Sequence, residues 1–210
     1  HRAARVVAGV LSGLLGVGGA VLTTPGIRVL GAGPLEAVGS TIPAILPGSL
    51  TGARRFARNG LVHTKVGGVC GGSGMVLAML GVWVADLVNP HLLMVLTAAL
   101  VGYSGWSLAR GSTPDANAED PAAAVLAADV ATPPTGLLMA VGAAAGFVAG
   151  LLGVGGGVVM VPAFTRILGL PVKVAIASSL VAVAIFSVPA LVVHTALDHV
   201  NWAYALPLVL

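Results

Sequence analysis

The sequence predicts an all-α polytopic membrane protein made of two homologous halves. Of its 210 residues, 57% are hydrophobic and only 8% are charged, and the mean hydropathy is +1.03. A soluble domain carries about 25% charged residues, so this chain could not cover a water-facing surface. Runs without Asp, Glu, Lys or Arg extend over 6–27, 37–53, 66–85, 87–109, 130–165 and 174–197. Most reach the roughly 20 residues that a helix needs to cross a hydrocarbon core.

The two halves are indicated by a glycine-rich motif that occurs twice. Gly13-Leu-Leu-Gly-Val-Gly-Gly19 returns as Gly150-Leu-Leu-Gly-Val-Gly-Gly156, and Pro25 and Pro162 follow the two copies at the same distance. Residues 8–25 and 145–162 share 11 identities in 18 positions. A period this long is typical of the duplication of half a domain, and much longer than that of a solenoid.

Residues 1–110 are predicted to form the first half, with about four transmembrane helices at 6–27, 37–56, 65–85 and 91–109. Pro43 and Pro47 interrupt the second helix, and the glycines of 67–74 favour close helix packing in the third. Residues 111–133 are a polar, acidic linker. The second half, 134–210, is predicted to hold about three helices, the last beginning at Asn201. Because the chain starts without Met and stops in an apolar run, we expect sequence to be missing at both ends, including an eighth helix.

The first helix of each half is expected to be broken at its glycine motif. The uncharged run 130–165 has 36 residues, which as one helix would be about 54 Å long, well beyond the bilayer core. Glycine disfavours a helix interior by about 1 kcal/mol per residue, so the breaks are placed at Gly16–Gly19 and Gly153–Gly157. Free amides and the positive dipole end of a restarting helix would bind a small oxyanion there. The alternative is that the glycines only permit close helix packing.

Hydroxyl side chains form a second set of candidates. Ser40-Thr41 and Ser178-Ser179 match at a shift of 138 residues, and their hydroxyls could donate to an anion. Helix capping, or a bond to the carbonyl of the preceding turn, is the alternative explanation. The candidate substrate-binding residues are Gly16, Gly18, Gly19, Pro25, Ser40, Thr41, Gly153, Gly155, Gly156, Gly157, Pro162, Ser178 and Ser179.

His194, inside the last complete span, is a candidate proton carrier, or alternatively a satisfied interfacial histidine. Gly71-Gly-Ser73-Gly74 fits the Gly-x-Ser-Gly motif of rhomboid-type proteases, with His194 as a conceivable base. Glycine-rich spans produce such a tetrad easily, so an enzyme is the weaker interpretation. Neither glycine motif has the Gly-Lys-Ser/Thr ending of a nucleotide loop, and we expect no cofactor and no metal.

Basic residues give the predicted orientation. Arg54, Arg55 and Arg58 make the loop after the second span the most basic one, which predicts that this loop is cytoplasmic. Counting spans from it places the N-terminus inside, both halves in the same orientation, and Arg28, Arg166 and Lys173 outside. Glu36 and Arg28 could pair in the short connection after the first span, and Arg166 and Lys173 could attract anions in the matching connection of the second half. Solvated charge in a connection is the alternative for all four. An odd number of crossings per half would instead give inverted repeats. The basic residues flank apolar spans, so the expected partner is the lipid bilayer and not nucleic acid.

Together these motifs resemble the sulfite exporter TauE/SafE family. The first half matches in Gly13–Gly19 with Pro25, in Ala37-Val38-Gly39-Ser40-Thr41 and in Arg58-Asn59-Gly60; the second matches in Gly150–Pro162 and Ala175-Ile176-Ala177-Ser178-Ser179. The resemblance implies a secondary transporter of about eight helices in the bacterial inner membrane. Its substrates would be sulfite, sulfonates or related sulfur-containing anions, moved by alternating access. An anion channel is the alternative, and a homo-oligomer is left open.

Overall fold

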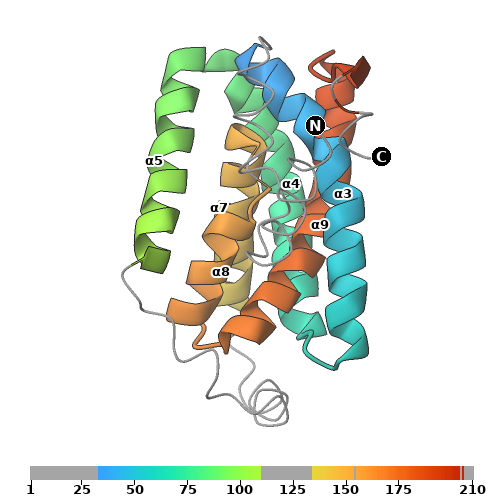
Figure 1. The fold of residues 1–210 in the computed structure, drawn as a ribbon, viewed down its shortest axis with the longest axis vertical. Coiled ribbons are helices and arrows are strands. Elements are labelled where there is room, and N and C mark those ends of the chain that lie inside the picture. Colours follow the sequence, from blue (N-terminus) through green and yellow to red (C-terminus); the bar gives the residue numbers. More distant parts are fainter. Residues whose placement is uncertain (1–32, 110–133, 154, 204, 206–210) are drawn as a thin grey trace.

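The computed structural model describes residues 33–109, 134–153, 155–203 and 205, which form a bundle of α-helices (Figure 1). The described helices are α3 (Pro34–Arg58), α4 (Thr64–Leu87), α5 (Pro90–Ala109), α7 (Thr135–Leu152), α8 (Gly157–Arg166) and α9 (Val172–Ala196). Of these, α4, α7 and α9 are long and apolar enough to cross a membrane. The prediction of a helical membrane protein is confirmed. The predicted first span, 6–27, and the linker, 111–133, lie outside the described residues.

Helix α3 runs without interruption through Pro43 and Pro47, so the interruption predicted there is wrong. Each proline removes one backbone donor from the helix. One turn after Pro47, the Thr51 hydroxyl donates to the Pro47 carbonyl at 2.7 Å. At the start of the helix, the Glu36 carboxylate accepts a hydrogen bond from the Gly33 amide at 3.2 Å. This acidic residue in the first turn favours the helix start at that point.

Small residues bring α4 against α7 and α9. A Cβ atom on Gly146 of α7 would overlap the Gly74 carbonyl of α4, and one on Gly150 would overlap the Ala78 carbonyl. On another face of α4, a Cβ on Gly71 would lie 2.7 Å from the Ile185 side chain of α9. Backbones approach this closely only where side chains are absent. The close packing predicted from the glycines of 67–74 is confirmed.

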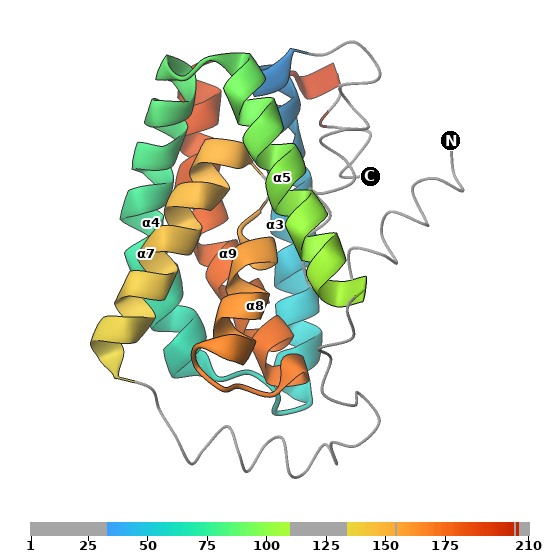
Figure 2. The same cartoon turned by 90° about the vertical axis from the view of Figure 1, so that its left-hand side faces the viewer.

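Helices α3 and α9, the second helices of the two predicted halves, run in opposite directions (Figures 1 and 2). The amide of Asn201, just beyond the end of α9, donates to the Ser40 hydroxyl near the start of α3. The amide of His63, just beyond the end of α3, donates to Ser178 near the start of α9. The predicted arrangement of both halves in one orientation is therefore wrong for this pair. The reason is that α8 returns to the end of the bundle from which α7 starts, as Figure 2 shows.

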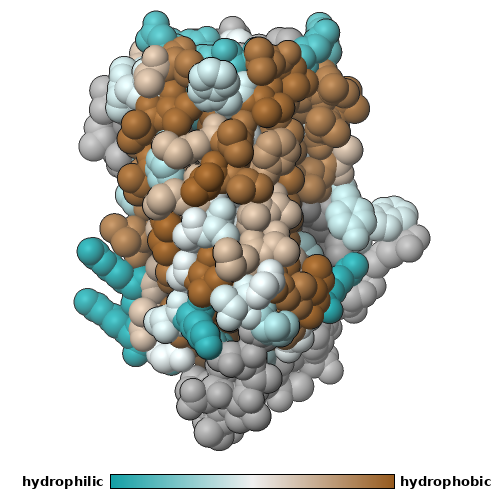
Figure 3. Space-filling model, turned by 180° about the vertical axis from the view of Figure 1, so that it is seen from behind, coloured by the Kyte–Doolittle hydropathy of each residue, from teal (hydrophilic) through white to brown (hydrophobic). Residues whose placement is uncertain are grey.

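The reversal also changes the placement of the charges. Arg166 and Lys173, which the sequence placed opposite Arg58, lie at the same end of the bundle as Arg58 because α8 ends and α9 begins there. Every described Lys and Arg is at this end, which we call the cationic end; these residues are Arg54, Arg55, Arg58, Lys65, Arg166 and Lys173. The described acids lie at the other end, the anionic end: Glu36, Asp86 and Asp198. Figure 3 shows apolar side chains between the two hydrophilic ends.

Candidate functional site

The site begins with a reversal of the chain between α7 and α8. Helix α7 ends at Leu152, and the backbone turns through Gly153, Gly155 and Gly156, whose φ angles are 62°, 80° and 65°. These angles lie in the left-handed region, which residues with a Cβ atom enter at a cost of about 1–2 kcal/mol each. Glycine at these positions permits the turn, and α8 then starts at Gly157.

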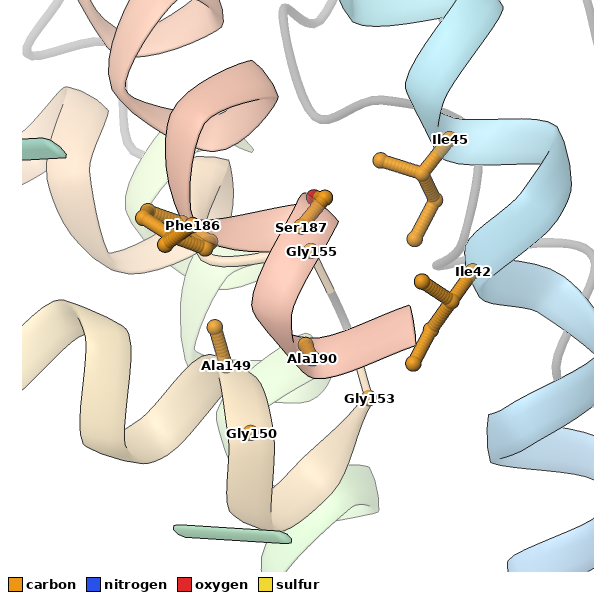
Figure 4. A pocket seen from close by; sticks show the side chains of 9 residues that line it. All are labelled: Ile42, Ile45, Ala149, Gly150, Gly153, Gly155, Phe186, Ser187 and Ala190. Atoms are coloured by element: carbon orange, nitrogen blue, oxygen red, sulfur yellow. The ribbon is translucent and has the colours of Figure 1, made fainter. Parts of the chain in front are cut away.

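A small cavity lies beside this reversal, near the middle of α3 and α9 (Figure 4). The space open to the centre of a water-sized sphere is about 10 Å³, which is room for about one water molecule. Most of the lining is apolar, and the Ser187 hydroxyl is its side-chain hydrogen-bond donor. The lining residues are Ile42, Ile45, Ala149, Gly150, Gly153, Gly155, Phe186, Ser187 and Ala190.

Helix α8 starts next to the cavity and ends at the cationic end of the bundle, so the positive end of its dipole is near the cavity. In its first turn, the Gly157 amide donates to the Gly155 carbonyl at 2.7 Å, and the Val159 amide donates to Gly156 at 3.1 Å. The Val158 amide donates to no carbonyl of the described residues. An amide in the first turn of a helix has no partner within the helix, and the positive dipole end favours an anion there.

The glycines of this motif also meet a packing requirement. A Cβ atom on Gly153 would overlap the Val38 side chain of α3, and one on Gly156 would lie 2.5 Å from the Phe186 ring. Close packing and an opened backbone therefore occur together at the second motif. Pro162 lies inside α8. The first copy, with Gly16, Gly18, Gly19 and Pro25, lies outside the described residues, and so does Arg28.

None of the four hydroxyl residues lines the cavity, although Ser40 and Thr41 directly precede its lining residue Ile42 in α3. Ser40, Thr41, Ser178 and Ser179 are all fully buried. Ser178 is eight residues before Phe186 in α9, about 12 Å along the axis, and Ser40 is near the opposite end of α3. The Thr41 and Ser179 hydroxyls donate to the carbonyls three residues before them, at 2.8 and 2.9 Å.

The contacts of Ser40 and Ser178 are equivalent and cross between the halves. Ser178 accepts the His63 amide at 3.0 Å, and Ser40 accepts the Asn201 amide at 2.9 Å. Both the serines and their donors are related by the same shift of 138 residues. Gly60 and Asp198, related by that shift as well, share a positive φ, at 69° and 57°. Loops of the same shape thus close the two ends of the bundle.

We expect Ser40→Ala and Ser178→Ala to destabilise the protein by similar amounts. Each change leaves a buried loop amide without its acceptor, which costs about 1–3 kcal/mol. Thermal unfolding of the purified protein in detergent measures the effect. Ser73→Ala is the control, because the Ser73 hydroxyl only donates to the Cys70 carbonyl of its own helix. Melting temperatures equal to that of Ser73→Ala would show that the two cross-half bonds contribute nothing.

His194 is buried in the last turn of α9, and neither ring nitrogen has a hydrogen-bond partner among the described residues. The described residues therefore supply no partner for a satisfied interfacial histidine. The Ser73–His194 hydrogen bond of the protease interpretation is not formed, since neither ring nitrogen of His194 has a partner among the described residues. Glu36 accepts a hydrogen bond from the Asn201 side chain at 2.6 Å.

Sequence reasoning missed most of the cavity lining. Ile42, Ile45, Phe186 and Ala190 are apolar residues in apolar spans, and no pattern distinguishes them from ordinary core or lipid-facing residues. Ser187 could have been identified from the sequence, because it is a hydroxyl residue two positions before Pro189 inside a predicted apolar span.

Comparison with known proteins adds to this picture. A family model described as sulfite exporter TauE/SafE matches residues 3–210. The chain is 29% identical over 221 residues to the probable membrane transporter protein YunE of Bacillus subtilis (strain 168), covering 97% of this chain and 80% of that protein. It is 31% identical over 196 residues to a probable membrane transporter protein of Xylella fastidiosa (strain Temecula1), covering 92% and 72%. No solved structure matches the chain.

Proposed function

The chain belongs to the sulfite exporter TauE/SafE family and is a membrane transporter, and we propose that it is a secondary carrier of small sulfur-containing anions such as sulfite and sulfonates. The observation that carries this proposal is the reversal between α7 and α8. It brings the first turn of a helix into the middle of an otherwise apolar bundle, where no buried cation is needed to hold an anion.

The chemistry of the cavity fits this substrate class. The Val158 amide at the start of α8 and the Ser187 hydroxyl would donate hydrogen bonds to the oxygens of a sulfite or sulfonate group. The apolar side chains of Ile42, Ile45 and Phe186 would face the organic part of a sulfonate. In the full site, Gly16–Gly19 would supply an equivalent turn from the first half, as the repeated motif suggests.

Alternating access is the mechanism that we propose for this carrier. A cavity with room for about one water is too small for a four-atom oxyanion, so binding requires the surrounding helices to move apart. The antiparallel α3 and α9, with equivalent loop contacts at opposite ends, support two halves of inverted orientation. In such a carrier, one end opens while the equivalent contacts at the other end stay closed.

We expect the cationic end to face the cytoplasm of a bacterial inner membrane, by the bias of Lys and Arg toward that side. A cysteine at Arg58 should react with a membrane-impermeant maleimide only after the cells are permeabilised, whereas a cysteine at Trp202 should react in intact cells. Cys70→Ser removes the native thiol, which is buried. The opposite labelling pattern would contradict this orientation.

A ligand screen tests the proposed substrate class. Thermal unfolding of the purified protein would be followed with sulfite, thiosulfate, methanesulfonate and sulfate, because a ligand that binds only the folded state raises the melting temperature. We expect stabilisation by one or more of the sulfur oxyanions and none by chloride. Saturable uptake into proteoliposomes would then support a carrier, while conductance without saturation would indicate the anion channel. Equal responses to all these salts would contradict a specific site.

A further inference from the structure

The two ends of the bundle carry equivalent clusters of different chemistry. At the cationic end, five apolar side chains pack together where α3 and the following loop meet the start of α9; we call this cluster the apolar latch. It consists of Phe56, Leu61, Val62, Val174 and Ala177. The shift of 138 residues that relates the serine contacts maps these positions, in order, onto His194, His199, Val200, Glu36 and Gly39. We call this second cluster, at the anionic end, the polar latch.

The polar latch is assembled in the same way as the apolar latch. A Cβ on Gly39 would overlap the backbone carbonyl of His199, so α3 and the loop after α9 are in direct contact. Glu36 accepts the hydrogen bond from the Asn201 side chain. The rings of His194 and His199 lie 5.5 Å apart, centre to centre. Two histidines and a glutamate thus take the places that Phe56, Leu61 and Val174 take at the other end.

His194 does not stabilise this cluster as Phe56 stabilises its own. A neutral imidazole has one N–H donor and one acceptor nitrogen, and burying them unpaired costs about 1–3 kcal/mol. His194 is fully buried with both nitrogens unpartnered. A phenylalanine there would fill a similar volume without that cost, as the apolar latch demonstrates.

Exposure decreases stepwise from Asp86 through His199 to this buried ring. The Asp86 side chain at the end of α4 is 46% exposed, and its Oδ1 lies 3.3 Å from Nε2 of His199, whose side chain is 13% exposed. His194, next to His199, is 0% exposed. A hollow of about 700 Å³ opens beside His199, lined also by Glu36 and Asp198. The charged groups facing the pair are these three acids, and no Lys or Arg of the described residues lies at this end.

We propose that His194 and His199 are the proton-binding site of the carrier, so that a proton is the coupling ion. A proton from the solution at the anionic end reaches Nε2 of His199 by way of the Asp86 carboxylate. The two imidazole rings then share this proton on the side of Nδ1 of His199 and the His194 ring. The pair holds one proton at a time, because two imidazolium rings this close would repel each other. This inference rests on the proposed function and adds the coupling ion to it.

Uptake of methanesulfonate into proteoliposomes tests the proposal, because this probe keeps the same charge as the pH changes. Accumulation would be driven by an imposed pH gradient, and exchange would be measured with equal anion concentrations and equal pH on both sides. His194→Phe installs the residue found at the equivalent place in the other half, which keeps the packing. His91→Phe is the matched control, since His91 is exposed on α5 outside the latch.

We expect His194→Phe to exchange methanesulfonate like the wild type but to lose accumulation driven by the pH gradient, with His91→Phe unchanged in both. Accumulation by His194→Phe equal to the wild type would overturn the proposal. Loss of exchange as well would also overturn it, since His194 would then be needed for handling the anion itself.

A measurement without any anion separates this proposal from the proposed function. Nitrogen-15 labelled histidine reports protonation of each ring by NMR. The two rings lie 5.5 Å apart, so in the wild type we expect protonation of one ring to change the NMR signal of the other, whereas in His194→Phe the His199 signal should respond alone. If the wild type transports no anion, the proposed function fails, and the NMR titration alone decides on the proton site: two independent titrations, or none, would overturn it.

Discussion

Gly155→Leu should abolish binding of sulfur oxyanions while the protein still folds. Gly155 lines the central cavity and lies within the reversal that precedes α8. A leucine side chain there would occupy the space in which an anion meets the α8 amides. Thermal-shift titration with sulfite would lose its response, and size-exclusion chromatography would still show a monodisperse protein. The equivalent change in the first motif, Gly18→Leu, should have the same effect if the halves share one site.

The strain at Gly155 needs its own control, because φ is 80° at this position and any substitution there is unfavourable. Gly169 provides it: its φ is 65°, and a Cβ atom at this position would meet nothing within 4 Å. Gly169→Leu adds comparable backbone strain outside the cavity, and sulfite binding should survive. Binding by Gly155→Leu at the wild-type level would mean that the glycines serve packing alone. Loss of binding in both variants would point to general destabilisation.

Gly146→Ala should be among the most destabilising single methyl additions in the described bundle. The new Cβ would overlap the backbone of Gly74, with three atoms of that residue closer than 3 Å. Backbone cannot rotate aside as a side chain can, so α4 and α7 must separate. Overpacking costs typically about 1–3 kcal/mol and occasionally more. Thermal unfolding in detergent would show a clear fall in melting temperature.

Gly72→Ala is the matched control in α4. Gly72 is exposed, and a Cβ atom there would meet nothing within 4 Å. Alanine is the better helix former by about 1 kcal/mol, so this variant should be as stable as the wild type or slightly more so. Equal melting temperatures for Gly146→Ala and Gly72→Ala would mean that the α4–α7 contact is looser than the structure indicates.

Much of the helical arrangement could be predicted from the sequence, because uncharged runs bounded by charged residues indicate where membrane-spanning helices begin and end. The 130–165 run was too long for one crossing, and the chain does stop being helical between Leu152 and Gly157. The direction taken after the interruption could not be predicted. Glycine permits many backbone conformations, and the reversal depends on contacts with distant residues such as Phe186.

The unpredicted direction of α8 explains the error in the orientation of the second half. If α8 had continued in the direction of α7, the chain would have crossed the bilayer, and Arg166 would lie at the end opposite Arg58. The inverted arrangement was visible in the sequence only as an alternative, through the awkward position of Arg166 and Lys173. The equivalence of His63 and Asn201 could not be predicted either, since their side chains differ and what they share is a backbone amide bonded to a serine of the other half.

Crystals grown with selenite, a heavier analogue of sulfite, test the central claim most directly, because selenium is located by its anomalous scattering. We expect one strong selenium peak beside Gly155, with an oxygen of the anion within hydrogen-bond distance of the Val158 amide in the first turn of α8. No such peak should occur in Gly155→Leu. A selenium peak only at the cationic end, or a wild-type cavity that stays empty at saturating selenite, would contradict an anion site at the α7–α8 reversal.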